Sequence, residues 1–167
     1  MIIVCGLRQA QEQIDLHGAR SVIGILSPET PHPVYRNIVD HQHLRLSFSD
    51  INEETAGLTA ATSGDAQRLI DFIRVWDQRE PLLVHCWAGI SRSTATAFAA
   101  MCMLNPEVDE MKLAAQLRAA SPSATPNKLI TEKVDHLLGR DGRMVDAVAS
   151  IGRGANAYEG MPFRLEL

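Results

Sequence analysis

The stretch LLVHCWAGISRS, residues 82–93, decides the fold of this chain. Its first three residues, Leu82-Leu83-Val84, form an apolar run that is short enough to be a strand covered on both faces, as in a parallel sheet. From Thr94 to Leu104 the chain is nearly all Ala, Phe, Met and Thr, and a helix that is apolar on every side is usually buried. We therefore predict a buried strand, a short loop and a buried helix in direct succession.

Outward from this stretch, the pattern predicts strands that alternate with helices. β-branched or alternating apolar residues indicate strands at 2–4, 21–26 and 44–48, and helical spacing indicates helices at 8–16, 63–76 and 127–138. This alternation predicts an α/β fold, a single domain with a central, mainly parallel sheet of about four to five strands flanked by helices. The domain would span residues 1–167.

Two further segments carry weaker patterns. Asn105 followed by Pro106 predicts the start of another helix, because Asn is a favoured N-cap and Pro fits the first turn. The glycine-rich stretch from Gly139 predicts a helix and then an irregular tail. Residues 140–167 thus form a C-terminal extension whose role the sequence does not reveal.

The composition excludes several classes of protein. Apolar residues make up 46% of the 167 residues and the formal net charge is -4, which argues against a protein that coats nucleic acid. No window approaches 18 consecutive apolar residues and the N-terminus lacks signal-peptide features, so we expect no membrane span and no secretion. Three cysteines without a C-x-x-C pair fit free thiols in a cytoplasmic protein. The oligomeric state cannot be predicted.

The loop after the strand has the features of an anion site. The strand delivers Cys86 at its carboxyl end, where ligands of open α/β sheets bind, and the helix begins near Arg92. Backbone N–H groups at a helix start have no intrahelical partner and attract anions. Gly89 permits the tight curvature that turns several amides toward one ion.

The same residues fit nucleophilic catalysis on phosphorus. A thiol at a helix N-terminus beside a cation ionises more readily than a free thiol, and the Ser93 hydroxyl can stabilise it further. The planar fork of Arg92 can bind two phosphoryl oxygens while charge spreads over them in the transition state. The spacing of Cys86 and Arg92 is weak evidence alone, but the residues around the pair make coincidence improbable.

Val84 through Ser93 closely resembles the signature V-H-C-x-x-G-x-S-R-S/T of the dual-specificity branch of the protein tyrosine phosphatase superfamily, matching every fixed position. The resemblance covers roughly residues 19 to 139 and implies a phosphocysteine intermediate at Cys86. It also implies that Ser93 assists thiolate release and that His85 supports the loop, although a packed strand-end histidine is an equal alternative. The implied phosphate-binding amides belong to Trp87, Ala88, Gly89, Ile90, Ser91 and Arg92.

A carboxylic acid must protonate the leaving group, and Asp50 is the best candidate. It follows the 44–48 strand, and parallel strands bring such ends to the edge of the sheet where Cys86 lies. Glu53 and Glu54 in the same loop stay open as alternatives, whereas Asp40 precedes the strand and Asp71 falls on a helix. The acid loop of the larger tyrosine phosphatases reads Trp-Pro-Asp, and this sequence reads Phe-Ser-Asp instead.

The leading interpretation is a phosphatase that needs no metal or cofactor and acts on phosphotyrosine, with phosphoserine or phosphothreonine as further substrates. Its partner would be a phosphorylated protein or a small phosphomonoester. Inositol phosphates or phospholipids remain alternatives, but the loop carries no lysine to bind a polyanion. A non-catalytic phosphate-binding pseudophosphatase and a rhodanese-like sulfurtransferase are the other two classes, and the intact Cys86, Arg92 and Ser93 argue against both.

Four other residues have chemistry to consider. His41 and His43 form an H-x-H pair that would suit a metal, but no further ligands accompany them, so we expect surface histidines. Cys5 or Cys102 could protect an oxidised Cys86 by forming a disulfide with it. Because Cys102 falls in a predicted buried helix, plain packing is the favoured interpretation.

Aromatic residues near the loop and in the tail have open roles. Trp87 either walls the predicted pocket or packs against the protein, and the sequence does not separate these roles. Tyr158, Phe163 and Leu165 in the tail could cover the site as a lid. We expect instead that they dock on the core.

Overall fold

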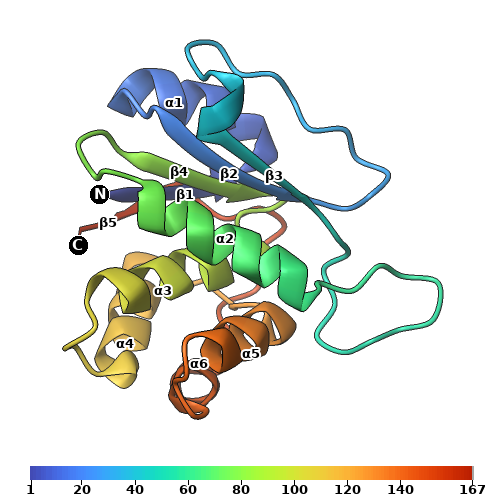
Figure 1. Ribbon diagram of the computed structural model, residues 1–167, viewed down its shortest axis with the longest axis vertical. Coiled ribbons are helices and arrows are strands. Elements are labelled where there is room, and N and C mark those ends of the chain that lie inside the picture. The colour runs from blue at the N-terminus through green and yellow to red at the C-terminus, as the bar shows by residue number, and fades with distance from the viewer. Residues whose placement is uncertain (167) are drawn as a thin grey trace.

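The computed structural model describes residues 1–166 and has an α/β fold built on a five-stranded sheet (Figure 1). The order of strands across the sheet is β3-β2-β4-β1-β5, and β5 alone runs antiparallel to its neighbour, β1. The predicted mainly parallel sheet is therefore confirmed. The strands are β1 (Ile2–Gly6), β2 (Ser21–Leu26), β3 (His43–Ser47), β4 (Leu82–Cys86) and β5 (Phe163–Leu165).

Helices cover both faces of the sheet. Figure 1 shows α1 on one face and α2 to α6 on the other. Apolar side chains form a small cluster under α1 and a larger core under the other helices. No helix in residues 1–166 has both the length and the apolar character that crossing a membrane requires. The helices are α1 (Ala10–His17), α2 (Ser63–Val75), α3 (Arg92–Leu104), α4 (Glu110–Ala120), α5 (Lys128–Leu137) and α6 (Arg143–Ile151).

The strand and helix around residues 82–93 occupy the centre of the fold, as predicted. β4 lies between β1 and β2, and all five of its residues are buried. α3 follows after a five-residue loop, and its residues 92–102 are buried on every side of the helix. Central burial on all sides explains why this segment carries almost no polar surface residues.

The helix expected to start at Asn105 starts later, so that prediction is wrong. The side-chain amide of Asn105 donates to the carbonyl of Met101 at 2.9 Å, which makes this residue the end of α3. α4 begins at Glu110, where the carboxylate of Asp109 caps it by accepting from the N–H of Met111 at 2.8 Å. Both Asn and Asp are good caps, so cap preference alone does not separate these two positions.

The C-terminal extension is part of the packed structure. Arg140 and Arg143 contact the buried carboxylate of Glu110 in α4 at 2.9 and 3.2 Å. The chain then returns to the sheet as β5, which pairs with residues 2–4 of β1. The prediction of an irregular tail was thus wrong for residues 163–165, which form a strand.

Candidate active site

Cys86 ends the central strand β4 and is 1% exposed. Its Sγ atom accepts a hydrogen bond from the backbone N–H of Gly89 at 3.3 Å and lies 3.2 Å from the hydroxyl oxygen of Ser93. Both neighbours can donate a hydrogen bond to the sulfur. The geometry therefore supplies two donors at the atom that would attack a substrate.

The loop after Cys86 turns tightly at Gly89, which packs against β1. Gly89 has a φ of +73°, and a Cβ there would lie 2.6 Å from the backbone carbon of Cys5 in β1, so the position requires glycine. Two loop carbonyls bond to segments outside the loop: that of Trp87 accepts from the N–H of Leu7 at 3.1 Å, and that of Ala88 accepts from the N–H of Gly160 at 2.8 Å.

The amides of the loop are available to an anion. Within residues 1–166, the backbone N–H groups of residues 87, 88, 90, 91 and 92 donate no hydrogen bond to the protein. Free backbone N–H groups at a helix start attract anions, so this run of donors fits an anion site. These residues belong to the set that the sequence analysis assigned to phosphate binding.

Arg92 is 4% exposed and points its guanidinium toward the ends of two strands. Its Nη1 donates to the carbonyl of Phe48 at 2.7 Å and to the hydroxyl of Ser27 at 3.3 Å. Its Nε is buried and has no hydrogen-bond partner in the described residues. A buried cationic N–H group without a partner is costly, and a bound anion would satisfy it.

Asp50 follows β3 and contacts Ser91 and Arg92, at the end of the loop that follows Cys86. One carboxylate oxygen accepts from the hydroxyl of Ser91 at 2.6 Å and from the side-chain amide of Asn127 at 2.9 Å. The other lies 3.7 Å from Nε of Arg92. The carboxylate is thus fixed at the rim of the loop, and its side chain keeps 38% exposure, which leaves it accessible to a substrate.

Within the described part of the chain, the other candidate acids make no hydrogen bond or ion pair with Ser91, Arg92 or Asn127. Glu53 and Glu54 are exposed, and their carboxylates make no hydrogen bond or ion pair in residues 1–166. Asp40 pairs with Arg45 at 2.7 Å, and Asp71 lies exposed on α2. No local sequence pattern links Asn127 and Ser91 to Asp50, so their contacts with it could not be predicted.

His85 is fully buried beneath the loop. The hydroxyl of Tyr35 lies 2.9 Å from its Nε2, and its Nδ1 lies 3.4 Å from the carbonyl oxygen of Cys86. Burial lowers the pKa of His85 to about 3, so the ring is neutral. With Nδ1 as the donor, the ring holds the Cys86 carbonyl while Tyr35 donates to Nε2.

The expectation of surface histidines in the H-x-H pair was wrong for His43. His41 is exposed, but His43 is buried, and its ring packs against Tyr35 and His32 with centroid distances of 5.3 and 6.2 Å. Burial lowers its pKa to about 4. No group of three or more His, Cys, Asp or Glu side chains in the described part of the chain could hold a metal ion.

The other cysteines are buried thiols. Cys5 lies in β1 and Cys102 in α3, and neither forms a disulfide in the structure. Burial raises the pKa of each to about 12. Such thiols are poor nucleophiles, which argues against a ready exchange with Cys86.

Trp87 and the tail meet at the edge of the loop. Trp87 is 39% exposed, and its ring lies edge-to-face against Tyr158 with 5.6 Å between centroids. Phe163 and Leu165 are buried in the core, as expected for docking residues. Tyr158 is 75% exposed, so the expectation of docking was wrong for this residue.

Comparisons with known proteins identify the fold. No family model matches the sequence, and the search of curated proteins found no match. Solved structures do match: DUSP15 has a TM-score of 0.65 at 20% identity, covering 90% of this chain and 89% of that one. The Yvh1 phosphatase domain from Chaetomium thermophilum has a TM-score of 0.62 at 17% identity, covering 86% of this chain and 93% of that one.

A human tyrosine phosphatase-like serine/threonine/tyrosine-interacting protein gives a TM-score of 0.63 at 18% identity, covering 84% of this chain and 92% of that one. These similarities extend over most of both chains in each comparison, although the sequences have diverged widely. Residues 1–166 therefore have the fold of the dual-specificity phosphatases.

Proposed function

We propose that this protein hydrolyses phosphate monoesters through a phosphocysteine intermediate. Cys86 is the nucleophile, Arg92 clamps the phosphoryl group, Asp50 is the general acid and Ser93 assists the thiolate. The observation that carries the proposal is the run of free amides in the loop that follows Cys86, together with the buried Nε of Arg92, which has no hydrogen-bond partner in residues 1–166.

In the first step, Cys86 Sγ attacks phosphorus and forms an S–P bond while the bond from phosphorus to the ester oxygen breaks. The leaving oxygen takes a proton from Asp50, whose carboxyl group lies at the rim of the loop. The loop amides and Arg92 stabilise the charge that spreads over the three equatorial oxygens.

In the second step, a water molecule attacks phosphorus, and the carboxylate of Asp50 accepts its proton. The S–P bond breaks with its electron pair returning to Sγ, and inorganic phosphate is released. The Ser93 hydroxyl, 3.2 Å from Sγ, can donate to the departing thiolate and so lowers this barrier.

The substrate is a singly phosphorylated group, phosphotyrosine above all, with phosphoserine and phosphothreonine as further substrates. The loop offers one cation, Arg92, and its other residues are uncharged. Inositol phosphates and phosphoinositides, which carry several phosphates, are the alternative within the same chemistry.

The proposed phosphatase domain spans residues 1–167, and the buried free thiols favour a cytoplasmic location.

A non-catalytic phosphate-binding module is the second candidate, since the fold is shared with a protein named as tyrosine phosphatase-like. Against it, Cys86, Arg92, Ser93 and Asp50 are all present, with Ser93 3.2 Å from Sγ of Cys86 and Asp50 3.7 Å from Nε of Arg92. Binding alone does not require the thiol. Sulfur transfer is disfavoured because Arg92 and Ser93 stand in the phosphatase positions.

Hydrolysis of para-nitrophenyl phosphate in the presence of a chelator tests the proposal. We expect turnover that vanadate inhibits, and no transfer of sulfur from thiosulfate. Purified, folded protein that binds phosphate without hydrolysing this ester would support the non-catalytic module instead.

The acid assignment needs its own test. Asp50→Asn should lower the turnover of a phenyl or alkyl phosphate about 100-fold or more, the usual scale for general acid catalysis. Para-nitrophenyl phosphate, whose leaving group needs less protonation, should be affected less. Glu53→Gln and Glu54→Gln serve as matched controls, and a larger loss in either of them would move the role to that residue.

A further inference from the structure

The segment of residues 153–160 is fixed against the candidate active site at both ends. At one end, the N–H of Gly154 donates to the hydroxyl of Thr125 at 3.1 Å, and that of Ala155 donates to the carbonyl of Pro122 at 2.8 Å. At the other end, the N–H of Gly160 donates to the carbonyl of Ala88 at 2.8 Å. The segment thus bridges the 121–127 loop and the phosphate-binding loop.

Close packing confirms this placement of the segment. A Cβ at Gly154 would lie 2.6 Å from the backbone carbon of Ser123, so no larger residue fits there without a shift. Before the segment, the guanidinium of Arg118 donates to the carbonyls of Ile151 and Gly152 at 2.7 and 2.9 Å. The chain on which Arg153 lies is therefore held in place from both sides.

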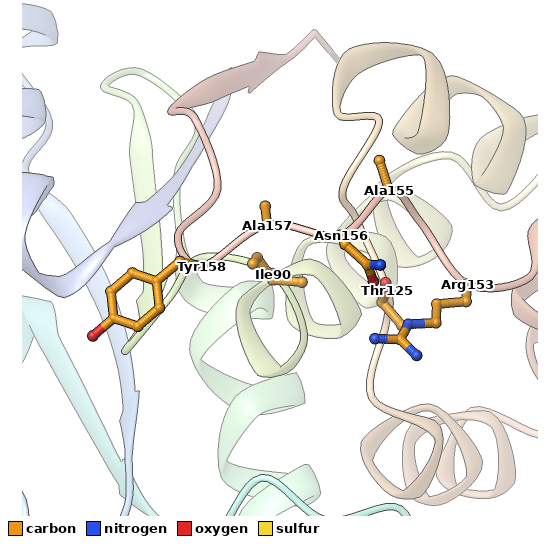
Figure 2. A pocket seen from close by; sticks show the side chains of 7 residues that line it. All are labelled: Ile90, Thr125, Arg153, Ala155, Asn156, Ala157 and Tyr158. Carbon is orange, nitrogen blue, oxygen red and sulfur yellow. The ribbon is translucent and has the colours of Figure 1, made fainter.

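A pocket of about 310 Å³ lies between this segment and the phosphate-binding loop (Figure 2). Its wall includes Ile90 and Thr125, and the tail supplies Arg153, Asn156 and Tyr158. Figure 2 shows these side chains coming from the two loops and from the tail that crosses between them.

The pocket lies next to the phosphate-binding loop, because Ile90 of that loop lines it and the N–H of Thr125, also in its wall, donates to the carbonyl of Ile90 at 2.9 Å. Ile90 precedes Ser91, and Thr125 lies two residues before Asn127; Ser91 and Asn127 are the residues that hold the carboxylate of Asp50. The pocket is therefore a neighbour of the loop that would hold the phosphate, where a side chain beside the phosphorylated residue could enter it.

The lining of the pocket fits an acidic side chain. Arg153 is exposed and takes part in none of the ion pairs of residues 1–166, and no carboxylate lines the pocket. The amide of Asn156 offers a second donor, and Ile90 and Tyr158 offer apolar surface for methylene groups. A single free cation suits one carboxylate, whereas sites for phosphate groups usually collect several arginines.

We propose that this pocket binds a glutamate or aspartate side chain of a phosphopeptide, next to the phosphorylated residue. The proposal rests on the proposed phosphatase function and adds the substrate class, an acidic phosphopeptide. Arg153 is the specificity-determining residue, and the C-terminal extension supplies a wall of the substrate site.

A glutamate scan tests the proposal. Phosphotyrosine peptides carrying one Glu at each position from −3 to +3, and matched peptides with Gln there, are compared by kcat/KM. We expect Glu to raise kcat/KM about threefold to tenfold at one or two positions, the scale of a charge-assisted hydrogen bond near the surface, and the gain to shrink with added salt.

Arg153→Gln should remove that gain and leave the hydrolysis of para-nitrophenyl phosphate within about twofold of wild type. Arg153→Lys should keep part of the gain, because a positive charge remains. Arg164→Gln is the matched control, since Arg164 is exposed on β5 and does not line the pocket.

Equal kcat/KM for the Glu and Gln peptides at every position, with normal hydrolysis of para-nitrophenyl phosphate, would overturn this inference and leave the proposed function intact. So would an Arg153→Gln variant that loses activity on an inositol bisphosphate but keeps the Glu preference. If the protein hydrolyses nothing, the proposed function fails. The binding affinities for the Glu and Gln peptides then show separately whether the pocket binds an acidic side chain, and equal affinities would overturn the inference.

Discussion

The side-chain amide of Asn127 donates a hydrogen bond of 2.9 Å to the carboxylate of Asp50, which lies 77 residues earlier in the chain. The amide oxygen of Asn127 accepts from the N–H of Ile130 at 3.0 Å and so caps α5. One residue therefore both starts a helix and fixes the candidate acid. In the proposed reaction Asn127 is a positioning residue, because it acts through Asp50.

Asn127→Ser separates these two roles, because serine keeps a helix cap but is too short to reach Asp50. We expect kcat/KM for phenyl phosphate to fall about tenfold, a part of the 100-fold or more expected for loss of the acid itself. Para-nitrophenyl phosphate should lose much less. Asn105→Ser, at the end of α3, is the control. A uniform loss for all leaving groups would mean that Asn127 has a structural role only.

Gly89→Ala should destabilise the protein more than Gly18→Ala does. Both glycines have positive φ values, +73° for Gly89 and +66° for Gly18. An alanine at either position is destabilised by roughly 1–2 kcal/mol, because its Cβ disfavours the left-handed conformation. A Cβ at Gly18 meets nothing within 4 Å, whereas one at Gly89 meets the backbone of β1. We expect at least about 2 kcal/mol of additional loss in urea unfolding. Equal losses would contradict the packing of the loop on β1.

His85 should make the protein sensitive to acid. Its pKa is about 3 in the folded state and about 6.5 in an unfolded chain. Between these values the unfolded chain binds a proton that the folded protein does not, so the free energy of unfolding falls as the pH drops from about 6.5 toward 3. The slope is at most about 1.4 kcal/mol per pH unit for this group.

Urea unfolding between pH 7 and pH 5 measures that slope. His85→Gln should reduce it, and His41→Gln, a change at an exposed position, should leave it at the wild-type value. An unchanged slope in His85→Gln would show that this histidine does not carry the acid sensitivity.

The central part of the site could be predicted because its determinants are local. A strand, a glycine and a helix start within residues 82–93 fix both the loop and the direction of its amides. The position of Asp50 followed from one further rule, that parallel strands end at the same edge of a sheet. These predictions needed neighbouring residues and the sheet topology, and no knowledge of side-chain packing.

The remaining features depend on contacts between distant segments. The H-x-H pattern suggested an exposed strand face, but the segment that carries Tyr35 covers His43. The strand β5 has three residues and forms because Phe163 and Leu165 pair with β1 at the other end of the chain. The contact between Asn127 and Asp50 joins two loops whose approach is set by α5 and β3 together.

Trapping the covalent intermediate is the most direct test of the account. Ser93→Ala should slow breakage of the S–P bond, so this variant is mixed with a radiolabelled phosphotyrosine peptide, quenched in denaturant and digested. We predict that the label appears on the peptide containing Cys86, and that Cys86→Ser, folded and still able to bind vanadate, shows neither label nor turnover. Release of phosphate without any label on that peptide, or substantial turnover by Cys86→Ser, would contradict the account.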